Sequence, residues 1–322
     1  FCEPVCPSRE ITMTPRQRIV LQRELSLDSS DPSVLKDYAY EAIDTCATDG
    51  LCELACPVNI NTGEYIKSLK QEFTSPLKTS ISKWAANHFK FTQNFARAAL
   101  HLGNIIESLV GTRALISISK IFNRFFSTPI WNSSLPSLAP LISSSEYSIK
   151  DKWVYFPSCV NRTLSSDSKK SSLVTILKQI SSKSGETFRI PKKINSICCS
   201  QPFSSKGYKD AAILMQEKTI DIIWESSNQG ELPVIMDTSS CTYQLLNPNL
   251  GLNESSIKKL EKIKIVDLVQ YLKQCVKKSK IPKLDYDIAI HPTCSTEKMG
   301  QTSSLKSLAE ICTKSVHIPK DW

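Results

Sequence analysis

The spacing of the cysteines constrains this chain more than any other feature. Of the twelve cysteines, five lie within the first 56 residues. Cys2–Pro7 has the pattern C-x3-C-P, Cys52–Pro57 repeats it, and Cys46 lies six residues before Cys52. Cysteines this close together, on loops that a proline ends, suit metal–thiolate sites better than disulfides that close long loops. The pattern therefore predicts two neighbouring metal clusters in a reducing compartment.

Each repeat resembles the end of the bacterial ferredoxin run C-x2-C-x2-C-x3-C-P. In that run the last cysteine ligates the other of the two clusters. The resemblance implies that one iron–sulfur cluster takes Cys6, Cys46 and Cys52, and that the other takes Cys2 and Cys56. Two clusters held close together imply electron transfer.

Two departures from that run affect the clusters. Asp49 stands where the second run should have its second cysteine. We expect either a three-iron (3Fe-4S) cluster there, or a four-iron (4Fe-4S) cluster with Asp49 or water on its fourth iron. The two leading cysteines of the first run would precede Phe1. We therefore expect this sequence to be an internal piece of a longer chain.

Length and composition favour an ordinary globular protein with more than one domain. The chain has 322 residues, of which 41% are hydrophobic and 22% charged, enough for two modest domains with their own cores. It has no apolar run near eighteen residues, so we expect no membrane-spanning segment. We expect a cytoplasmic protein, with peripheral contact at the inner membrane as an option.

A basic stretch lies between Lys78 and Arg124. It contains seven lysines and arginines but only one acid, Glu107, and aromatic residues interleave with the charges. Three interpretations remain open. The stretch is a helical connector whose apolar face packs on the cluster domain, a surface that touches an anionic membrane, or a nucleic-acid surface. No recognition motif accompanies the charge, so we expect no nucleic-acid partner.

Periodicity and turn residues predict an α+β multidomain fold. We expect an α-helical ferredoxin-type domain over 1–75, a helical connector over 76–126, a linker over 127–150, an α/β module over 151–280 and the start of a second such module over 281–322. Short helices near 15–26, 32–46 and 61–73 leave the first cysteines on loops. Later, strands at 153–156, 188–190, 233–236 and 287–290 alternate with helices at 167–183, 208–226 and 266–278, which predicts a largely parallel sheet.

A second group of cysteines follows those strands. Strand 153–156 leads to Cys159, strand 233–236 to Cys241 and strand 287–290 to Cys294, while Cys198 and Cys199 lie between the first two. Strand ends of a parallel sheet meet at one edge. We therefore expect four of these thiols to converge on one metal centre, namely Cys159, Cys198, Cys199 and Cys241. Adjacent cysteines suit a multinuclear cluster better than tetrahedral zinc, which stays as an alternative.

The second group resembles the cysteine-rich CCG module shared by heterodisulfide reductase, lactate-utilisation proteins and glycolate oxidase iron–sulfur subunits. The residues that carry the resemblance are Phe156-Pro-Ser-Cys159 and Cys198-Cys199-Ser-Gln-Pro-Phe. Ser200 replaces the usual glycine, and the usual closing C-x2-C is reduced to Cys241, with Thr238 at the earlier position. A second copy begins at His291-Pro-Thr-Cys294 and stops at Trp322, before its own cysteine pair.

Taken along its length, the sequence is similar to the C-terminal half of bacterial FAD-linked D-lactate dehydrogenases with fused iron–sulfur domains. The matching phrases are Thr14-Pro-Arg-Gln-Arg-Ile19, Ile60-Asn-Thr-Gly63 and His291-Pro-Thr-Cys-Ser295, together with the two cysteine runs. The resemblance implies an upstream FAD domain of the vanillyl-alcohol-oxidase type and a quinone or other acceptor. The rival interpretations are a separate iron–sulfur subunit of a glycolate oxidase, and a heterodisulfide-reductase-type protein.

Overall fold

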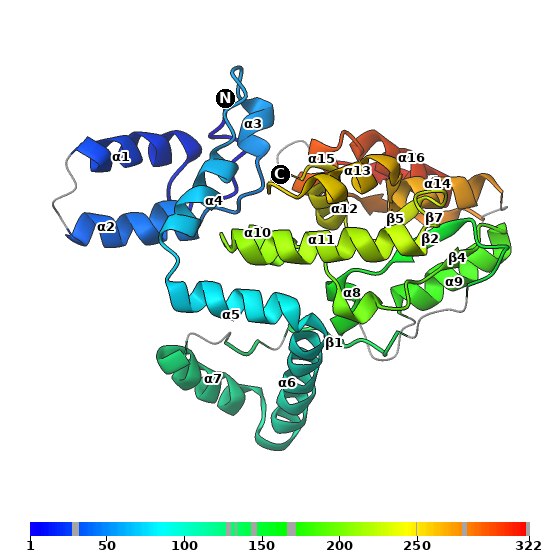
Figure 1. The fold of residues 1–322 in the computed structure, drawn as a ribbon, viewed down its shortest axis with the longest axis horizontal. Helices are drawn as coiled ribbons and strands as arrows, with labels where there is room; N and C mark the ends of the chain where they lie inside the picture. The colour runs from blue at the N-terminus through cyan, green and yellow to red at the C-terminus, as the bar shows by residue number, and fades with distance from the viewer. Residues whose placement is uncertain are drawn as a thin grey trace.

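The computed structural model describes residues 1–27, 32–126, 130–132, 134–142, 147–165, 172–248, 250–278 and 282–319. Figure 1 shows an N-terminal helical part on one side and an α/β part on the other, with a pair of helices projecting below them. The two cysteine-bearing parts are therefore separate from each other in the fold, as the sequence predicts. The boundaries assigned to the five segments stay predictions.

The N-terminal part is built from short helices around a small core. It contains α1 (Pro15–Leu27), α2 (Pro32–Tyr38), a π-helical turn η1 (Ala39–Asp44), α3 (Leu51–Ala55) and α4 (Thr62–Glu72). The Asn61 side chain accepts a hydrogen bond from the backbone N–H of Glu64 at 3.0 Å and so caps α4. The buried core of the N-terminal part consists of Leu25, Tyr38, Ala42, Ile43, Ile66 and Leu69. The cysteines lie around this core on the intervening loops and on α3.

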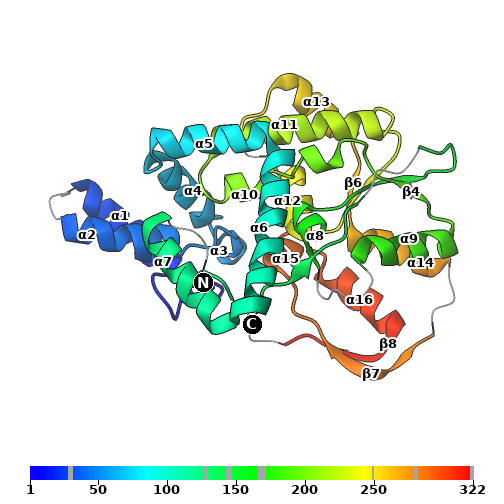
Figure 2. The same cartoon turned by 90° about the horizontal axis from the view of Figure 1, so that it is seen from below.

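The α/β part contains a four-stranded parallel sheet with the order β4-β2-β5-β6. Its strands are β2 (Trp153–Phe156), β4 (Phe188–Arg189), β5 (Val234–Met236) and β6 (Ile265–Asp267). In Figure 2, α9 (Leu173–Ser184) and α14 (Leu268–Lys277) lie on one side of the sheet, and α11 (Lys209–Ser226) and α13 (Glu254–Lys262) lie on the other. The short β6 falls at the start of what the sequence predicted as a helix from 266, so that strand was missed.

The fourth predicted strand does not join this sheet. β7 (Leu284–Ala289) pairs instead with β8 (Thr313–His317), in parallel, as a separate two-stranded sheet, and α16 (Thr302–Cys312) connects them. β7 carries Asp285 and Asp287 and is largely exposed, whereas all four residues of β2 are buried. A strand thus precedes Cys294, as predicted, but it belongs to this separate sheet rather than to the four-stranded one.

The basic stretch is helical, as predicted, and forms α5 (Pro76–Asn87), α6 (Phe89–Val110) and α7 (Thr112–Phe126). Lys78, Lys83 and Lys90 are exposed. The connector interpretation expected their apolar face to pack on the N-terminal part, whereas the main contacts of α5 and α6 are with the α/β part. Lys83 Nζ lies 2.8 Å from the Asp210 carboxylate on α11, and Ala86 and Phe89 join the core of the α/β part.

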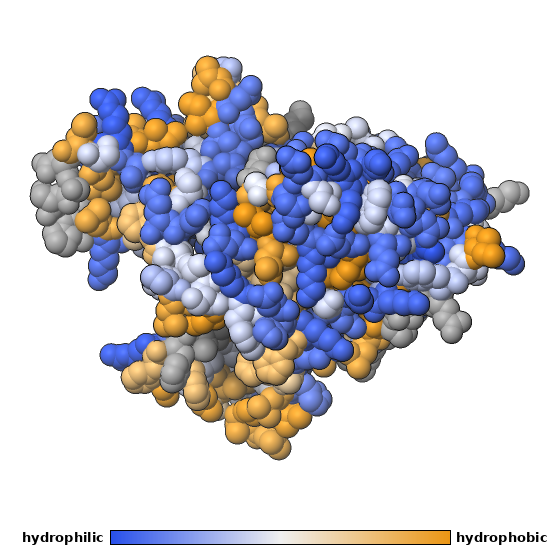
Figure 3. All heavy atoms as spheres, in the orientation of Figure 1, coloured by the Kyte–Doolittle hydropathy of each residue, from blue (hydrophilic) through white to orange (hydrophobic). Residues whose placement is uncertain are grey.

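Much of the apolar surface of α6 and α7 is exposed, against the prediction that it would be buried. Figure 3 shows apolar side chains gathered at the end of the molecule that these helices form. The exposed residues include Phe91, Phe95, Leu102, Leu109, Ile118, Ile121 and Phe125. In the linker, the short strand β1 (Ser137–Leu138) pairs antiparallel with β3 (Leu164–Ser165). Within the described ranges, no helix is long and apolar enough to cross a membrane.

Candidate iron–sulfur sites

Four thiols from separate elements meet at the carboxyl edge of the main sheet. Cys159 begins α8 (Cys159–Thr163) directly after β2, and Cys241 lies in α12 (Ser239–Leu246) after β5. Cys198 and Cys199 follow the short helix η2 (Ile194–Ser196). The Cys159 and Cys198 sulfur atoms are 3.5 Å apart, and the Cys199 thiol donates to the Cys241 sulfur at 2.9 Å. The structure thus brings together the four cysteines that the strand order predicts; that they bind a cluster stays a prediction.

The sulfur–sulfur distances are shorter than expected for ligands of one cluster. The sequence predicted separations of about 4–8 Å, given metal–sulfur bonds near 2.3 Å, and both measured distances fall below that range. In the described part of the chain, no three His, Cys, Asp or Glu side chains are grouped so that they could hold a metal ion. Because both sulfur–sulfur distances fall below the range expected for cluster ligands, binding a cluster requires these thiols to move apart.

Burial keeps these thiols protonated and places a cation beside them. The hydrogen bond with Cys198, followed by burial, raises the pKa of Cys159 well above its ordinary value. Burial also lowers the pKa of the Arg162 guanidinium, and Cys159 and Cys198 act in the opposite direction when they are thiolates. Arg162 is 2% exposed and donates to the carbonyls of Ile194 and Ile197, but its Nε has no hydrogen-bond partner. A buried cation with a spare N–H fits an anionic metal–thiolate group.

Three further residues position this site, and the sequence analysis did not assign them this role. Ser200, in place of the usual glycine, has φ 75° and is fully buried, which shows why a glycine suits this position. Gln93 of α6 donates to the Cys159 carbonyl at 3.2 Å and so connects the basic helices to the site. The Asp237 carboxylate accepts from the Tyr155 hydroxyl at 2.7 Å and from the Ser158 N–H at 2.9 Å.

The N-terminal cysteines also have a buried arginine beside them. Cys6 and Cys52 are 8% and 6% exposed, and Cys46 is half-buried. Arg18 of α1 is 1% exposed and directs its Nη1 at the Cys6 sulfur, 3.7 Å away. Its Nε and Nη2 have no hydrogen-bond partner. Burial raises the pKa of Cys46, whereas Arg18 acts in the opposite direction. The orphaned N–H groups therefore fit an anionic cluster held by Cys6, Cys46 and Cys52.

Cys56 has a different environment from the other thiols. Hydrogen bonds from the backbone N–H groups of Ile60 and Val58 lower its pKa. A ring of backbone donors around a sulfur stabilises the thiolate that iron requires. Cys2 is half-buried. That Cys2 and Cys56 share one cluster stays a prediction.

Asp49 and Cys294 meet although 245 residues separate them. The Cys294 sulfur lies 3.6 Å from Oδ2 of Asp49, whose Oδ1 accepts from the Leu51 N–H at 3.1 Å. Burial, followed by the Asp49 charge, raises the pKa of Cys294 to about 11. Cys294 therefore contacts the N-terminal part at Asp49, the position where the second cysteine run departs from the ferredoxin pattern.

The two thiol sites approach each other through a packed boundary. Lys70 at the end of α4 contacts the Cys46 carbonyl at 3.4 Å and the Ser205 carbonyl at 3.5 Å. Ser205 lies in the turn that follows the Cys198-Cys199 pair and α10 (Gln201–Ser204). Gly207, with φ 79°, lies so close to Lys70 and Gln71 that a Cβ there would be 2.7 Å from Lys70 Cβ. The loop after one cysteine group therefore rests on the helix beside the other.

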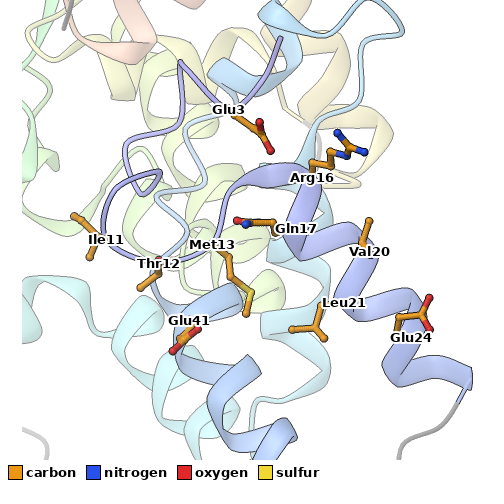
Figure 4. A pocket seen from close by; sticks show the side chains of 10 residues that line it. All are labelled: Glu3, Ile11, Thr12, Met13, Arg16, Gln17, Val20, Leu21, Glu24 and Glu41. Atoms are coloured by element: carbon orange, nitrogen blue, oxygen red, sulfur yellow. The ribbon is translucent and has the colours of Figure 1, made fainter.

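A cleft of about 790 Å³ opens on the N-terminal part. Figure 4 shows side chains of α1 and of the loop before it lining this cleft, with Glu41 of η1 opposite. Three of its lining residues are acidic, namely Glu3, Glu24 and Glu41. The lining also contains one cation, Arg16, and one amide, Gln17. Among the described residues that line the cleft there is no cysteine, although Glu3 lies next to Cys2 in the chain.

Comparisons with known proteins match both cysteine-bearing parts. Residues 1–61 match the family model of a 4Fe-4S dicluster domain, and residues 153–246 match that of a CCG cysteine-rich domain. Comparison with curated proteins and comparison with solved structures each found no match. The chain thus carries two iron–sulfur-type domains, a combination consistent with an oxidoreductase role in electron transfer.

Proposed function

We propose that this chain is the iron–sulfur portion of an FAD-dependent dehydrogenase for D-lactate or a related 2-hydroxy acid. It would pass electrons from a flavin domain or flavoprotein subunit to a quinone or another acceptor. The observation that carries the proposal is that two groups of cysteines, each beside a buried arginine, meet across one packed boundary. The sequence phrases similar to FAD-linked D-lactate dehydrogenases support the choice of substrate.

Each group of residues has a distinct role in this proposal. Iron–sulfur clusters, when bound, accept and release electrons one at a time. Cys6, Cys46 and Cys52 would hold one cluster, Cys2 and Cys56 part of another, and the four thiols at the sheet edge a third. Arg18 and Arg162 balance negative charge where water is excluded. Lys70 fixes the distance between the two parts, on which the rate of electron transfer depends.

The test is whether D-lactate reduces the clusters of the protein purified without oxygen, together with any flavoprotein that accompanies it. We expect D-lactate, but not L-lactate, to produce the same low-temperature EPR signals as dithionite. Signals with dithionite but none with D-lactate would overturn the choice of substrate. Reduction by glycolate alone would favour the glycolate oxidase subunit, and the absence of any signal with dithionite would overturn electron transfer itself.

We also propose that α7 contacts an anionic membrane, where a quinone acceptor would be dissolved. Ile118, Ile121 and Phe125 recur along one face of the helix and are 41%, 60% and 73% exposed. Arg113, Lys120 and Arg124 are exposed along the edge of that face. An exposed apolar face edged by cations is the pattern of a helix that lies in the plane of a membrane surface.

Sedimentation with vesicles tests this contact. The protein should sediment with phosphatidylglycerol vesicles but not with phosphatidylcholine vesicles, and salt should weaken the binding because it screens the charges. The double variant Ile121→Ser, Phe125→Ser should stay in the supernatant. Ile149→Ser, which changes a still more exposed apolar residue outside the helices, should bind as the wild type does. Equal sedimentation of both variants would exclude α7 as the contact.

A further inference from the structure

The second cysteine run lacks one ligand, and a thiol from the far end of the chain lies at that position. Asp49 stands where the run should have a cysteine. Cys294 begins α15 (Cys294–Lys298), and its sulfur is 3.6 Å from the Asp49 carboxylate. The helix α15 lies beside α3 in both views of the fold (Figures 1 and 2), and the two are in contact. α3 itself carries Cys52.

Several contacts hold α15 at this place. Lys298, at the other end of the helix, is 6% exposed and lies 3.4 Å from the Glu53 carboxylate on α3. Its ammonium also sits over the Tyr243 ring, 4.5 Å from the centroid. Before the helix, the Thr293 hydroxyl lies 2.7 Å from that of Ser239 at the start of α12. These contacts fix Cys294 relative to both the N-terminal part and the α/β part.

We infer that Cys294 is the fourth protein ligand of the cluster held by Cys6, Cys46 and Cys52. This inference rests on the proposed function, because it assumes that those three cysteines bind iron. A thiolate is a softer ligand than a carboxylate and suits iron–sulfur centres better. An iron–sulfur bond forms as the S–H bond of Cys294 breaks, and the proton passes to the Asp49 carboxylate or to water. The cluster would then join two segments 245 residues apart.

The test compares variants in a background with Cys2→Ser, Cys56→Ser and serine at positions 159, 198, 199 and 241, so that neither of the other two proposed clusters contributes a signal. The whole chain is loaded with iron and sulfide without oxygen, and then treated briefly with ferricyanide. In the parent, four thiolates should protect the cluster from losing iron. With Cys294→Ser, roughly one iron per protein should be lost and a three-iron EPR signal should appear, as expected for a cluster with three thiolates. Cys312→Ser, which removes another half-buried cysteine, should behave as the parent.

Two further variants separate the possible failures. Asp49→Ala should leave the cluster with four irons; a three-iron signal here, with Cys294→Ser unchanged, would make Asp49 the ligand and overturn the inference. Cys46→Ser should lose the whole cluster. Iron content equal to that of the parent in Cys46→Ser would instead refute the proposed site. Circular dichroism of each variant before loading identifies any that fail to fold, and Cys294→Ala then provides a second removal of the thiol.

Discussion

The guanidinium of Arg18 lies 3.7 Å from the Cys6 sulfur and is 1% exposed, with two of its nitrogens lacking hydrogen-bond partners. Burying a cation without a full set of acceptors is costly. The cost is offset if the neighbouring cysteines carry negative charge, as they do when they bind iron. The arrangement therefore makes sense as part of a cluster site rather than of a hydrophobic core.

Arg18→Gln should lower the reduction potential of the cluster beside Cys6, because the cation stabilises the more negatively charged reduced form. A shift on the order of 60 mV is expected, which corresponds to about 1.4 kcal/mol for one electron. An EPR redox titration measures it. Arg16→Gln, on the exposed side of the same helix, is the matched control. A potential that changes equally in both variants would indicate that Arg18 serves only the fold.

The convergence of Cys159, Cys198, Cys199 and Cys241 could be predicted because it depends on strand order alone. Strands 153–156 and 233–236 are continuously apolar, and adjacent parallel strands end at the same edge of a sheet. The structure places β2 next to β5 with Val154 opposite Val234. The cysteines that follow these strands therefore had to come close to each other. Their separations could not be predicted, because they depend on side-chain rotamers within the pocket.

Contacts between distant segments could not be predicted in the same way. Nothing near Cys294 indicates that it meets Asp49, because their contact depends on how α15 packs against α3. Arg18 is one of several basic residues in its segment, and only the fold shows that it is buried while Arg16 is exposed. Likewise, periodicity in α7 predicts an amphipathic helix, but it does not show whether protein covers the apolar face.

Ser200 adopts φ 75°, a left-handed conformation that is unfavourable for any residue with a Cβ. Its hydroxyl donates to the Gln216 side chain at 3.2 Å. Both Ser200→Gly and Ser200→Ala lose this hydrogen bond, but only alanine keeps the backbone strain. The alanine variant should therefore be less stable than the glycine variant by about 1–2 kcal/mol. Urea unfolding of the metal-free protein measures the difference, and equal stabilities would show that the strain is not present in solution.

The thiols at the sheet edge should make the metal-free protein sensitive to alkali. The hydrogen bond with Cys198 and burial raise the pKa of Cys159. The hydrogen bond with Cys199 lowers the pKa of Cys241, but burial together with the charges of Cys198, Cys159 and Asp237 raises it overall. Unfolded thiols have a pKa near 8.5 and release their protons above about pH 8, whereas the folded thiols keep theirs to higher pH. The stability of the folded state should therefore be constant below about pH 8 and fall as the pH rises further. Urea unfolding between pH 7 and 10 under reducing conditions measures this slope.

The control for the alkaline effect is a variant with serine at positions 159, 198, 199 and 241. Serine does not ionise in this range, so the variant should lose less stability between pH 8 and pH 10 than the wild type. A parallel decline in both proteins would assign the alkaline effect to other groups, such as the buried tyrosines.

Gly207 and Gly251 provide a matched test of the boundary between the two thiol sites. Both have positive φ, 79° and 81°, so alanine strains the backbone at either position. At Gly251 no atom lies within 4 Å of an added Cβ, whereas at Gly207 that Cβ would be 2.8 Å from the backbone of Gln71. Gly251→Ala should therefore cost about 1–2 kcal/mol from strain alone. Gly207→Ala should cost a further 1–3 kcal/mol or so, because the loop has to move away from α4.

Urea unfolding gives the two stability losses, and the cluster-loaded protein shows their consequence for function. If the loop that follows Cys199 keeps the two sites together, Gly207→Ala should slow electron exchange between the N-terminal and sheet-edge clusters, as followed by rapid-freeze EPR. Gly251→Ala should leave that rate unchanged, because no atom lies within 4 Å of the added Cβ and no segment has to move away from α4. Equal stability losses in the two variants would mean that the loop and α4 are not in contact in solution, and the boundary would then not set the distance between the sites.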